Sequence, residues 1–344
     1  MAQESETLAS HGYEVKGELG RGGYSSCYLV SSTQYGLDFA CKITPRDKLA
    51  RMQDSHREVE MTVASGHPNV IQAYDYFDDE QNSYIILEHC PGGSLGDMVR
   101  KGGRIGGVRK QLIAGDLLRA VAWCHGCGIG HSDIKPDNVL FDRFGRAKLS
   151  DFGLAQVAEE GSLSEKFSGS LKYAAPEVLL RKPYNPLKAD IWAVGVTLFT
   201  LATGHSPWRT ECAGSLLRMA QRGYYALPPN TDPYLASAVA RCIVVNPEER
   251  ASVGELMEME IAKAPRRSHT QEVTGKVFLK ASTSASVCTS ASVCTSASTS
   301  VCASGYCIGM RRRYAKLQRT SGARLVEVGL PPLRWFEDLE TKSL

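Results

Sequence analysis

The sequence predicts an α+β protein with two lobes, a β-rich lobe over residues 13–88 and a mainly helical lobe over residues 91–264. Three observations support this prediction. Apolar residues alternate in short runs before position 88, and they recur at helical spacing after position 91. The turn-forming run Cys90-Pro91-Gly92-Gly93 separates the two patterns. An apolar fraction of 43% over 344 residues is sufficient to build a buried core.

The first lobe is expected to contain five strands and one helix. Short apolar runs bounded by turn residues predict the strands, at 13–19, 26–31, 37–43, 70–77 and 84–87. Between the third and fourth strands, apolar residues at helical spacing predict a helix over 51–65. This helix is expected to stop at Gly66-His67-Pro68.

The second lobe is expected to be built from helices. Residues 108–125 place apolar side chains on one helix face, at Leu112, Ile113, Leu117, Leu118, Val121 and Ala122. Further helices are predicted near 187–204, 212–221, 234–244 and 252–262. The uncharged stretch 191–208 contains Gly204 and Pro207, so we interpret it as a buried core helix and not as a membrane span.

Both ends of the chain are expected to lie outside the domain of residues 13–264. Residues 1–12 are interpreted as an N-terminal extension. The tail, 265–344, carries twelve Lys and Arg against five acids, a net charge of +7, which leaves the first 264 residues near −4. Within this basic tail, residues 281–304 repeat T-S-A-S-V-C and hold neither charges nor large apolar side chains, which predicts a disordered spacer.

Composition narrows the functional classes. The net charge of +3 comes from the tail, so it does not indicate a nucleic-acid-binding domain. The first twenty residues are polar and carry several acids, which argues against a secretory signal. The cysteines are therefore expected to be reduced and the location cytoplasmic, with nuclear entry left open. Cys124 and Cys127 form one C-x-x-C pair without a second, so we interpret them as thiols near a helix end and not as zinc ligands.

The most informative feature of the chain is the run His131-Ser132-Asp133-Ile134-Lys135-Pro136-Asp137-Asn138, followed thirteen positions later by Asp151-Phe152-Gly153. Asp133 is a carboxylate able to take a proton from a hydroxyl group, and Lys135 offers a positive charge to a phosphate. Asn138 and Asp151 offer oxygen ligands to Mg²⁺. Together these groups are the parts needed to move the γ-phosphoryl group of ATP to an alcohol.

This spacing resembles the catalytic and magnesium loops of eukaryotic protein kinases. Three further motifs match the same family: Ala175-Pro176-Glu177, the run D-I-W-A-V-G that begins at Asp190, and Arg250 in N-P-E-E-R. The resemblance covers about residues 13–262 and implies a bilobal protein-kinase-like fold. The I-K-P-D-N run and Ser170 in G-S-L-K-Y are similar to the serine/threonine branch of the family.

The resemblance also implies roles for the residues of these motifs. Glu177 and Arg250 would form a buried ion pair that closes the lower lobe. Asp190 would hold the backbone of the catalytic loop from the start of the core helix. Ser170 would contact the catalytic aspartate and lysine, Asp133 and Lys135.

The nucleotide is expected between the lobes. Glycines after the first strand would let backbone N–H groups close over phosphates, although Ser25 replaces the family's third glycine. The resemblance implies a strand lysine with a carboxylate partner on the next helix, and backbone groups at the adenine edge. The implied ATP-binding residues are Leu19, Gly20, Gly22, Cys27, Ala40, Lys42, Glu58, Glu88, Cys90 and Leu140. Taken one at a time, these features also fit a plain strand turn, a solvated lysine and an ordinary buried strand.

One departure from the family pattern affects regulation. Ser132 stands where the family usually has an arginine, which in many relatives pairs with a phosphate on the activation segment. In this chain the activation segment would run from Asp151 to Glu177. We therefore hypothesise that phosphorylation of Ser162, Ser164 or Ser168 is not required for activity.

A second departure affects substrate preference. Ser94 and Thr200 stand where some relatives carry carboxylates that bind basic substrate side chains, while Asp137 remains. This pattern therefore does not predict a strong preference for arginine upstream of the acceptor hydroxyl.

Several alternatives stay open at this point. The basic run 311–320 fits a solvated segment best. A segment that docks on the acidic body and inhibits it comes second, and a calmodulin-type or lipid-surface site comes third. A pseudokinase is disfavoured because Lys42, Asp133 and Asp151 are all present. A small-molecule phosphotransferase is disfavoured by Glu177 and Arg250. The prediction is a serine/threonine protein kinase that uses ATP and Mg²⁺, acts on protein substrates and has no membrane span.

Overall fold

The computed structural model describes residues 2–23, 25–47, 66–102, 105–158, 161–210 and 212–263. All of these residues belong to one unit, Met1–Gln271. Four features named above lie outside the described residues: the helix predicted over 51–65 with Glu58, the basic tail, its spacer over 281–304, and the basic run 311–320.

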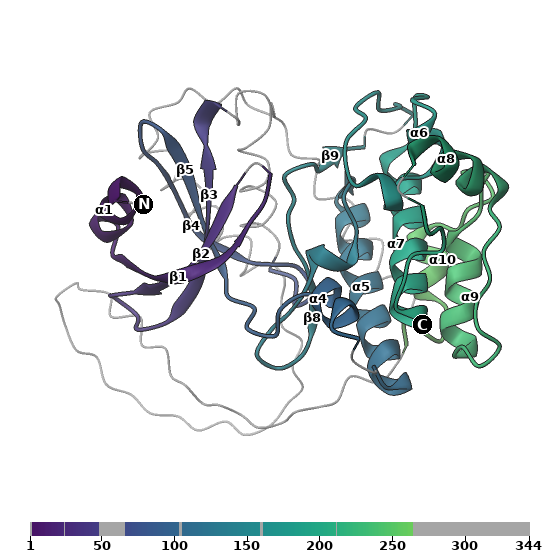
Figure 1. Ribbon diagram of the computed structural model, residues 1–344, viewed down its shortest axis with the longest axis horizontal. Helices are drawn as coiled ribbons and strands as arrows, with labels where there is room; N and C mark the ends of the chain where they lie inside the picture. The colour runs from purple at the N-terminus through teal and green to yellow at the C-terminus, as the bar shows by residue number, and fades with distance from the viewer. Residues whose placement is uncertain are drawn as a thin grey trace, which may run out of the picture. The chain divides into compact units, whose positions relative to one another are not determined.

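The first lobe is one antiparallel sheet with the strand order β1-β2-β3-β5-β4 (Figure 1). Its strands are β1 (Tyr13–Arg21), β2 (Ser26–Ser32), β3 (Asp38–Pro45), β4 (Ala73–Asp78) and β5 (Asn82–Glu88). All five predicted strands are confirmed. The fourth begins at Ala73 and not at 70, because Val70 pairs with Leu149 of the second lobe instead of with β5.

A helix that the sequence did not predict covers part of this sheet. α1 (Ala2–Ser10) lies beside the strands in Figure 1, within the segment interpreted as an extension. Its Leu8 is fully buried with Tyr28, Val30 and Ile86 in the core of the first lobe. Only one turn of α1 carries a large apolar residue, so the apolar periodicity that would predict this helix is weak.

The second lobe is mainly helical, as predicted. Its helices are α4 (Leu95–Arg100), α5 (Gly107–Gly126), α6 (Pro176–Leu179), α7 (Pro186–Thr203), α8 (Ala213–Arg222), α9 (Pro233–Cys242) and α10 (Val253–Met257). The prediction of a helix up to 262 was wrong beyond Met257. Turns follow there, and Arg119 of α5 donates to the carbonyl of Ala262 at 2.9 Å, so tertiary contacts override local helix propensity.

Helix α7 is the centre of this lobe. Asn185 caps its first turn by accepting from the amide of Leu187 at 2.9 Å, and Gly204 ends it in the left-handed conformation. Most of its side chains are buried, Trp192 completely, so the prediction of a core helix in this stretch is confirmed. Across the described ranges, the structure has no helix long and apolar enough to cross a membrane.

Four short strands place two loops against each other. β6 (Ile129–Gly130) pairs with β9 (Gln156–Val157), and β7 (Val139–Phe141) pairs with β8 (Ala147–Leu149). The single-turn helices η1 (Pro136–Asn138) and η2 (Leu171–Tyr173) complete the lobe. The loop between β6 and β7 carries Asp133, and the loop between β8 and β9 carries Asp151. The pairing of these strands therefore brings the two sequence motifs together.

A buried ion pair joins two parts of the second lobe, as the resemblance implied. Arg250 donates to both carboxylate oxygens of Glu177, at 2.7 and 3.1 Å, and its side chain is fully buried. Its remaining N–H groups donate to backbone carbonyls, including that of Lys188 at 2.6 Å. The guanidinium also lies over the ring of Trp192, 5.2 Å from the ring centroid. The ion pair thus links the start of α6 to the core helix.

Replacing Arg250 by leucine should lower the free energy of unfolding by about 3–5 kcal/mol, because Glu177 would keep a buried charge without its partner. Urea denaturation measures this loss. Arg241→Leu is the matched control, since Arg241 and Glu255 form an exposed ion pair whose removal should change stability little. Equal losses for the two variants would contradict a structural role for the buried pair.

Candidate active site

The catalytic loop is fixed to the core helix by one carboxylate. Asp190 is 1% exposed, and it accepts hydrogen bonds from the amides of His131 at 2.7 Å and Ser132 at 2.9 Å. Ser132 has a φ of +66°, a conformation that is costly for a residue with a side chain. The two hydrogen bonds stabilise this bend. The implied role of Asp190 is confirmed.

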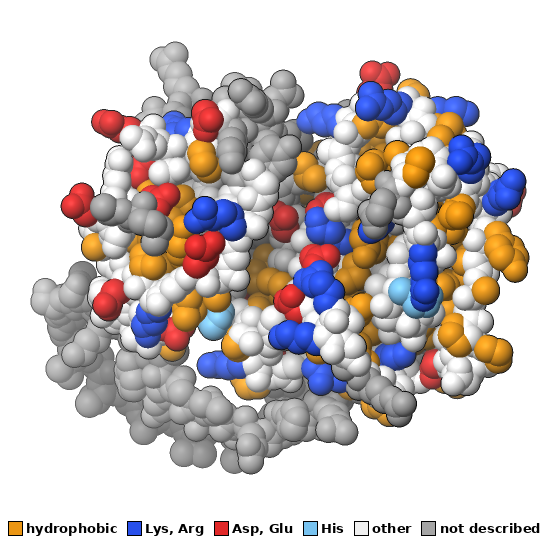
Figure 2. All heavy atoms as spheres, in the orientation of Figure 1, with side chains coloured by type: hydrophobic (Ala, Val, Ile, Leu, Met, Phe, Trp, Pro, Cys, Tyr) orange, Lys and Arg blue, Asp and Glu red, His pale blue; other side chains and the backbone are white. Residues whose placement is uncertain are grey.

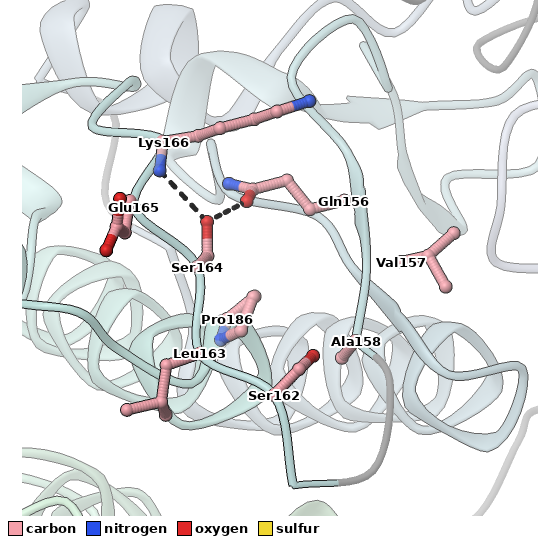
Figure 3. A pocket seen from close by; sticks show the side chains of 9 residues that line it. All are labelled: Gln156, Val157, Ala158, Ser162, Leu163, Ser164, Glu165, Lys166 and Pro186. Atoms are coloured by element: carbon pink, nitrogen blue, oxygen red, sulfur yellow. Dashed lines mark hydrogen bonds between the residues drawn. The ribbon is translucent and has the colours of Figure 1, made fainter.

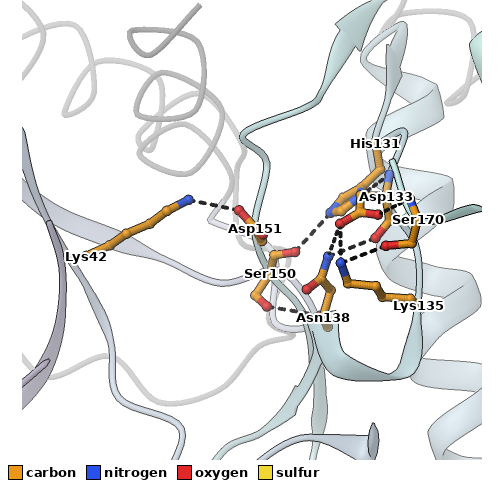
Figure 4. Close-up of polar contacts among 8 residues, drawn as sticks. All are labelled: Lys42, His131, Asp133, Lys135, Asn138, Ser150, Asp151 and Ser170. Atoms are coloured by element: carbon orange, nitrogen blue, oxygen red, sulfur yellow. Dashed lines mark hydrogen bonds and ion pairs between the residues drawn. The ribbon is translucent and has the colours of Figure 1, made fainter. Parts of the chain in front are cut away.

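Asp133 lies at the centre of a small hydrogen-bonded cluster (Figure 4). Lys135 Nζ is 2.6 Å from Asp133 Oδ2, and Asn138 Nδ2 donates to the backbone carbonyl of Asp133 at 2.8 Å. From the activation segment, the amide of Ser170 donates to Asp133 Oδ1 at 3.0 Å. Lys135 Nζ also donates to Ser170 Oγ at 2.9 Å, as the resemblance implied. The carboxylate orientation is therefore set from two segments of the chain.

A second connection ties the loop of Asp151 to the catalytic loop. His131 Nε2 contacts the carbonyl of Ser150 at 3.0 Å, and Ser150 Oγ donates to the carbonyl of Asn138 at 3.0 Å. Asp151 itself has a φ of +64°, so both loops carry a positive φ at or next to a predicted site residue. The geometry brings Asn138 and Asp151, the two predicted metal ligands, to neighbouring positions.

The two lobes meet at an ion pair. Lys42 Nζ on β3 is 2.8 Å from Asp151 Oδ1 (Figure 4). The lysine holds the pKa of the Asp151 carboxyl below its ordinary value, so this carboxylate is ionised at neutral pH. The side chain of Asp151 is 47% exposed, which leaves oxygen surface for a ligand. The partner that the resemblance implied for Lys42, Glu58, lies outside the described residues.

Gly20 and Gly22, the glycines expected near the phosphates, leave space beside the backbone for a ligand. Neither Gly20 nor Gly22 has a positive φ, and a Cβ added at Gly20 would meet no atom of the described residues within 4 Å. Neither the backbone conformation nor packing against these residues therefore requires glycine at position 20. Open space beside a strand that precedes a tight turn is what a bound phosphate group needs.

The segment joining the lobes offers a hydrogen-bond donor. No described residue accepts a hydrogen bond from the amide of Cys90, whereas the amide of Glu88 donates to the carbonyl of Gln72 at 2.8 Å. The Glu88 carboxylate pairs with Lys148 at 2.7 Å, and the lysine side chain is almost completely buried. Sequence reasoning missed Lys148, because a lysine on a three-residue strand carries no motif.

The other predicted pocket residues lie on the facing strands. Ala40 on β3 is buried and pairs with Leu87 of β5. Cys27 is opposite Lys42 in the register of β2 and β3. Leu140 lies on β7 and bridges to Ser94, so it belongs to the second lobe. Leu19 on β1 is 47% exposed and free to contact a ligand.

Alkylation tests the surroundings of Cys27. Burial raises the pKa of its thiol to about 11, so the thiol stays protonated at pH 8, and the thiolate is the form that reacts. We expect iodoacetamide to modify native Cys27 at least about tenfold more slowly than the unfolded chain, measured by peptide mass spectrometry.

Cys212 is the internal control for this measurement. It is exposed, and hydrogen bonding from the amide of Ser215 lowers its pKa, so it should react rapidly. If native and unfolded chains were modified at Cys27 at the same rate, the burial of Cys27 would be contradicted.

A comparison with known protein families matches the protein kinase domain over residues 13–261. CBL-interacting protein kinase 25 of Oryza sativa subsp. japonica is 33% identical over 264 residues, which cover 73% of this chain and 51% of the relative. CBL-interacting serine/threonine-protein kinase 12 of Arabidopsis thaliana is 32% identical, with 72% and 51% covered. Sperm motility kinase 2A of Mus musculus is 31% identical, with 71% and 48% covered.

These relatives share a defined part of the chain. The matched segment spans about half the length of each relative, and it contains both lobes described above. The family match covers well over half of this chain and includes all the motifs from the glycine-rich turn to Arg250. The predicted fold class and family resemblance are confirmed. The chain belongs to the protein kinase family, on its eukaryotic serine/threonine branch.

Proposed function

We propose that the protein transfers the γ-phosphoryl group of ATP to serine or threonine hydroxyls of protein substrates. The observation that supports this proposal best is the cluster around Asp133 in the second lobe, next to an ion pair between Asp151 of the same lobe and Lys42 of the first lobe. The presence of Lys42, Asp133 and Asp151 together argues against a pseudokinase. The buried pair of Glu177 and Arg250 argues against a small-molecule phosphotransferase.

The proposed nucleotide site combines both lobes. The Cys90 amide and the backbone of Glu88 would face the adenine, between Leu19, Cys27 and Ala40 on one side and Leu140 on the other. In this proposal Gly20 and Gly22 leave room for the phosphates. Lys42 would bind the phosphates by leaving Asp151, an exchange of one anionic partner for another that keeps its charge compensated.

Asn138 and Asp151 would hold magnesium. The Asn138 amide nitrogen donates to Asp133, so its carbonyl oxygen is the atom left to act as a ligand. Asp151 supplies an ionised carboxylate, and oxygen donors of this kind are what Mg²⁺ prefers. When bound, the ion shields the negative charge of the phosphates.

Asp133 would act as the base that accepts the proton of the substrate hydroxyl. Lys135 and the amide of Ser170 occupy one carboxylate oxygen each, at 2.6 and 3.0 Å, so they hold the carboxylate in one orientation. Lys135 would also place a positive charge near the transferred group, and this charge stabilises the transition state. Phosphoryl transfer of this type needs positioned charges and no covalent enzyme intermediate.

Replacing Asp133 by asparagine tests this proposal directly. The variant keeps the shape of the side chain and loses the base, so kcat should fall by about 10²–10⁴-fold. Incorporation of labelled phosphate into a generic protein substrate measures the change, and Asp47→Asn, at an exposed position, serves as the control. An inactive wild-type protein, or a variant with full activity, would contradict the proposal.

The structure suggests how substrate choice is set near the catalytic loop. Arg100 on α4 donates to Asp137 at 2.6 Å and to Asp97 at 2.7 Å, so both carboxylates are already paired with a cation. Ser94, at a position where some relatives carry a carboxylate, caps α4 instead. Figure 2 shows acidic and basic side chains mixed over the described part of the face that it presents to the viewer. We propose that Arg100 weakens any preference for basic residues upstream of the acceptor.

Replacing Arg100 by alanine should free Asp137 for a basic substrate side chain. The ratio of kcat/KM for an arginine-containing peptide to that for its alanine counterpart should rise by up to about fivefold, as expected for one exposed ion pair. Arg218→Ala, on the exposed face of α8, is the matched control. If the ratio did not change in Arg100→Ala, the proposed role of Arg100 in specificity would be wrong.

Location, domain limits and partners are further proposals. We place the kinase domain at 13–264, the basic tail after it, and the protein in the cytoplasm, where the seven described free cysteines would stay reduced. The names of the plant relatives state an interaction with CBL. Half of each relative lies outside the matched segment, so we do not extend that partner to this chain.

A further inference from the structure

One connection between the activation segment and the catalytic loop is made by an amide side chain of the segment itself. Gln156 on β9 is 6% exposed. Its Nε2 donates to Ser132 Oγ at 3.1 Å and to the hydroxyl of Tyr184 at 3.1 Å. Ser132 is the residue directly before the catalytic Asp133. Gln156 therefore contacts the catalytic loop at the position where the family usually carries an arginine.

The same amide also binds a later part of the activation segment. Its Oε1 accepts a short hydrogen bond from Ser164 Oγ, which Figure 3 shows together with the cavity that Gln156 lines. Ser164 and Tyr184 exchange backbone hydrogen bonds of 2.7 and 3.0 Å, and the hydroxyl of Tyr184 donates to the carbonyl of Lys166 at 2.7 Å. We call the side chains of Ser132, Gln156, Ser164 and Tyr184 the Gln156 hub.

A second contact shows how closely the segment lies on the catalytic loop. Gly169 has a φ of +101°, and a Cβ added there would lie 2.6 Å from the carbonyl oxygen of Ser132. Only glycine fits at this separation. The next residue, Ser170, donates its amide to Asp133. Movement of the segment away from Ser132 would therefore also remove a hydrogen bond from the catalytic carboxylate.

All four side chains of the Gln156 hub are uncharged. Serine and glutamine do not titrate, and burial raises the pKa of Tyr184 above its ordinary value, so the hub keeps its hydrogen bonds across the neutral pH range. Gln156 Oε1 can only accept, so it needs the proton that Ser164 Oγ donates. A phosphate ester on Ser164 has no such proton and would bring negative charge against this oxygen.

We propose that Gln156 is a positioning residue for phosphoryl transfer, which holds the activation segment on the catalytic loop without a phosphate, and that phosphorylation of Ser164 opposes this arrangement. Gln156 acts through Ser132 and Ser170 on Asp133 and does not contact the reacting groups. The inference rests on the proposed kinase activity. It gives a physical basis for activity that does not require phosphorylation of the segment.

Gln156→Met removes the hydrogen bonds and keeps a side chain of similar length. Its kcat should fall by about 10- to 100-fold, the scale of loss expected when a catalytic group is misplaced, with KM for ATP nearly unchanged. Gln221→Met, at an exposed position on α8, is the matched control and should keep wild-type values. Equal kcat for the wild type and Gln156→Met would overturn the proposal.

Gln156→Glu separates hydrogen bonding from packing. An ionised carboxylate cannot donate to Ser132 or Tyr184, whereas the protonated form has one O–H donor and the shape of the amide. Burial favours the protonated form. The kcat of this variant relative to the wild type should therefore rise as the pH falls from 8 to about 5.5. A ratio that does not depend on pH would contradict the assigned role of the amide.

Phosphorylation gives a third test. Ser164→Asp should lower kcat more than Ser164→Ala, and phosphatase treatment of the wild-type protein should change its turnover by less than about threefold. A hundredfold loss after phosphatase treatment, or activation by Ser164→Asp, would overturn the proposal.

Hydrogen exchange distinguishes failure of this inference from failure of the proposed function, because it needs no activity. The amides of Ser164 and Tyr184 are hydrogen-bonded to each other's carbonyls, so they should exchange faster in Gln156→Met than in Gln221→Met. If the wild-type protein were inactive but the two amides still exchanged faster in Gln156→Met, the role of Gln156 in holding the segment would stand and the proposed kinase activity would be rejected. Unchanged exchange in an active protein would reject the role of Gln156 alone.

Discussion

The carboxylate of Asp190 is the contact on which the geometry of the active site depends. Asp190 is buried in the first half of α7, and most side chains of this helix are buried. Its carboxylate accepts hydrogen bonds from two successive amides of the catalytic loop. A loop held in this way moves only if the core of the lobe moves. The strained backbone at Ser132 is maintained by these hydrogen bonds, and the position of Asp133 follows from it.

From this fixed loop the remaining contacts extend in two directions. His131 reaches the carbonyl of Ser150 and so fixes the loop of Asp151, which in turn binds Lys42 of the first lobe. On the other side, Ser132 binds Gln156, which connects the loop to the activation segment. The contacts of His131 and Ser132 within the second lobe are hydrogen bonds to a backbone carbonyl and to a side-chain amide. Between the lobes, Lys42 pairs with Asp151 and Glu88 pairs with Lys148. A nucleotide and a cation could take over the two charges of the Lys42–Asp151 pair.

Much of the fold could be predicted from the sequence, because strands and helices leave periodic patterns. The five strands of the first lobe and the core helix were found in this way, and the helix at 253–257 was overextended because the turns after it depend on contacts with α5. The candidate site residues, from Asp133 to Asp151, are proposed from the sequence because their types and spacing match a known motif, and the structure brings their loops together. The ion pair of Glu177 and Arg250 was implied by the same resemblance and is confirmed.

The contacts that the sequence did not reveal are of a different kind. Three side chains each bind a residue that is distant along the chain. Gln156 binds Ser132, 24 positions away, and Lys148 binds Glu88, 60 positions away. Arg100 binds Asp137, 37 positions away. Such pairs depend on how loops meet after folding, and no periodicity or motif marks them. The burial of Leu8 from α1 has the same origin, since one apolar side chain in a polar helix predicts no docking face.

The most direct test of this account is a crystal structure with a non-hydrolysable ATP analogue and Mg²⁺. We predict that Lys42 contacts the phosphates, that Asn138 and Asp151 bind the metal ion, and that the hydrogen bonds from Asp190 to the catalytic loop are unchanged. A nucleotide bound elsewhere, or a catalytic loop detached from Asp190 when the nucleotide is bound, would contradict the central claim that this loop is preformed on the core helix.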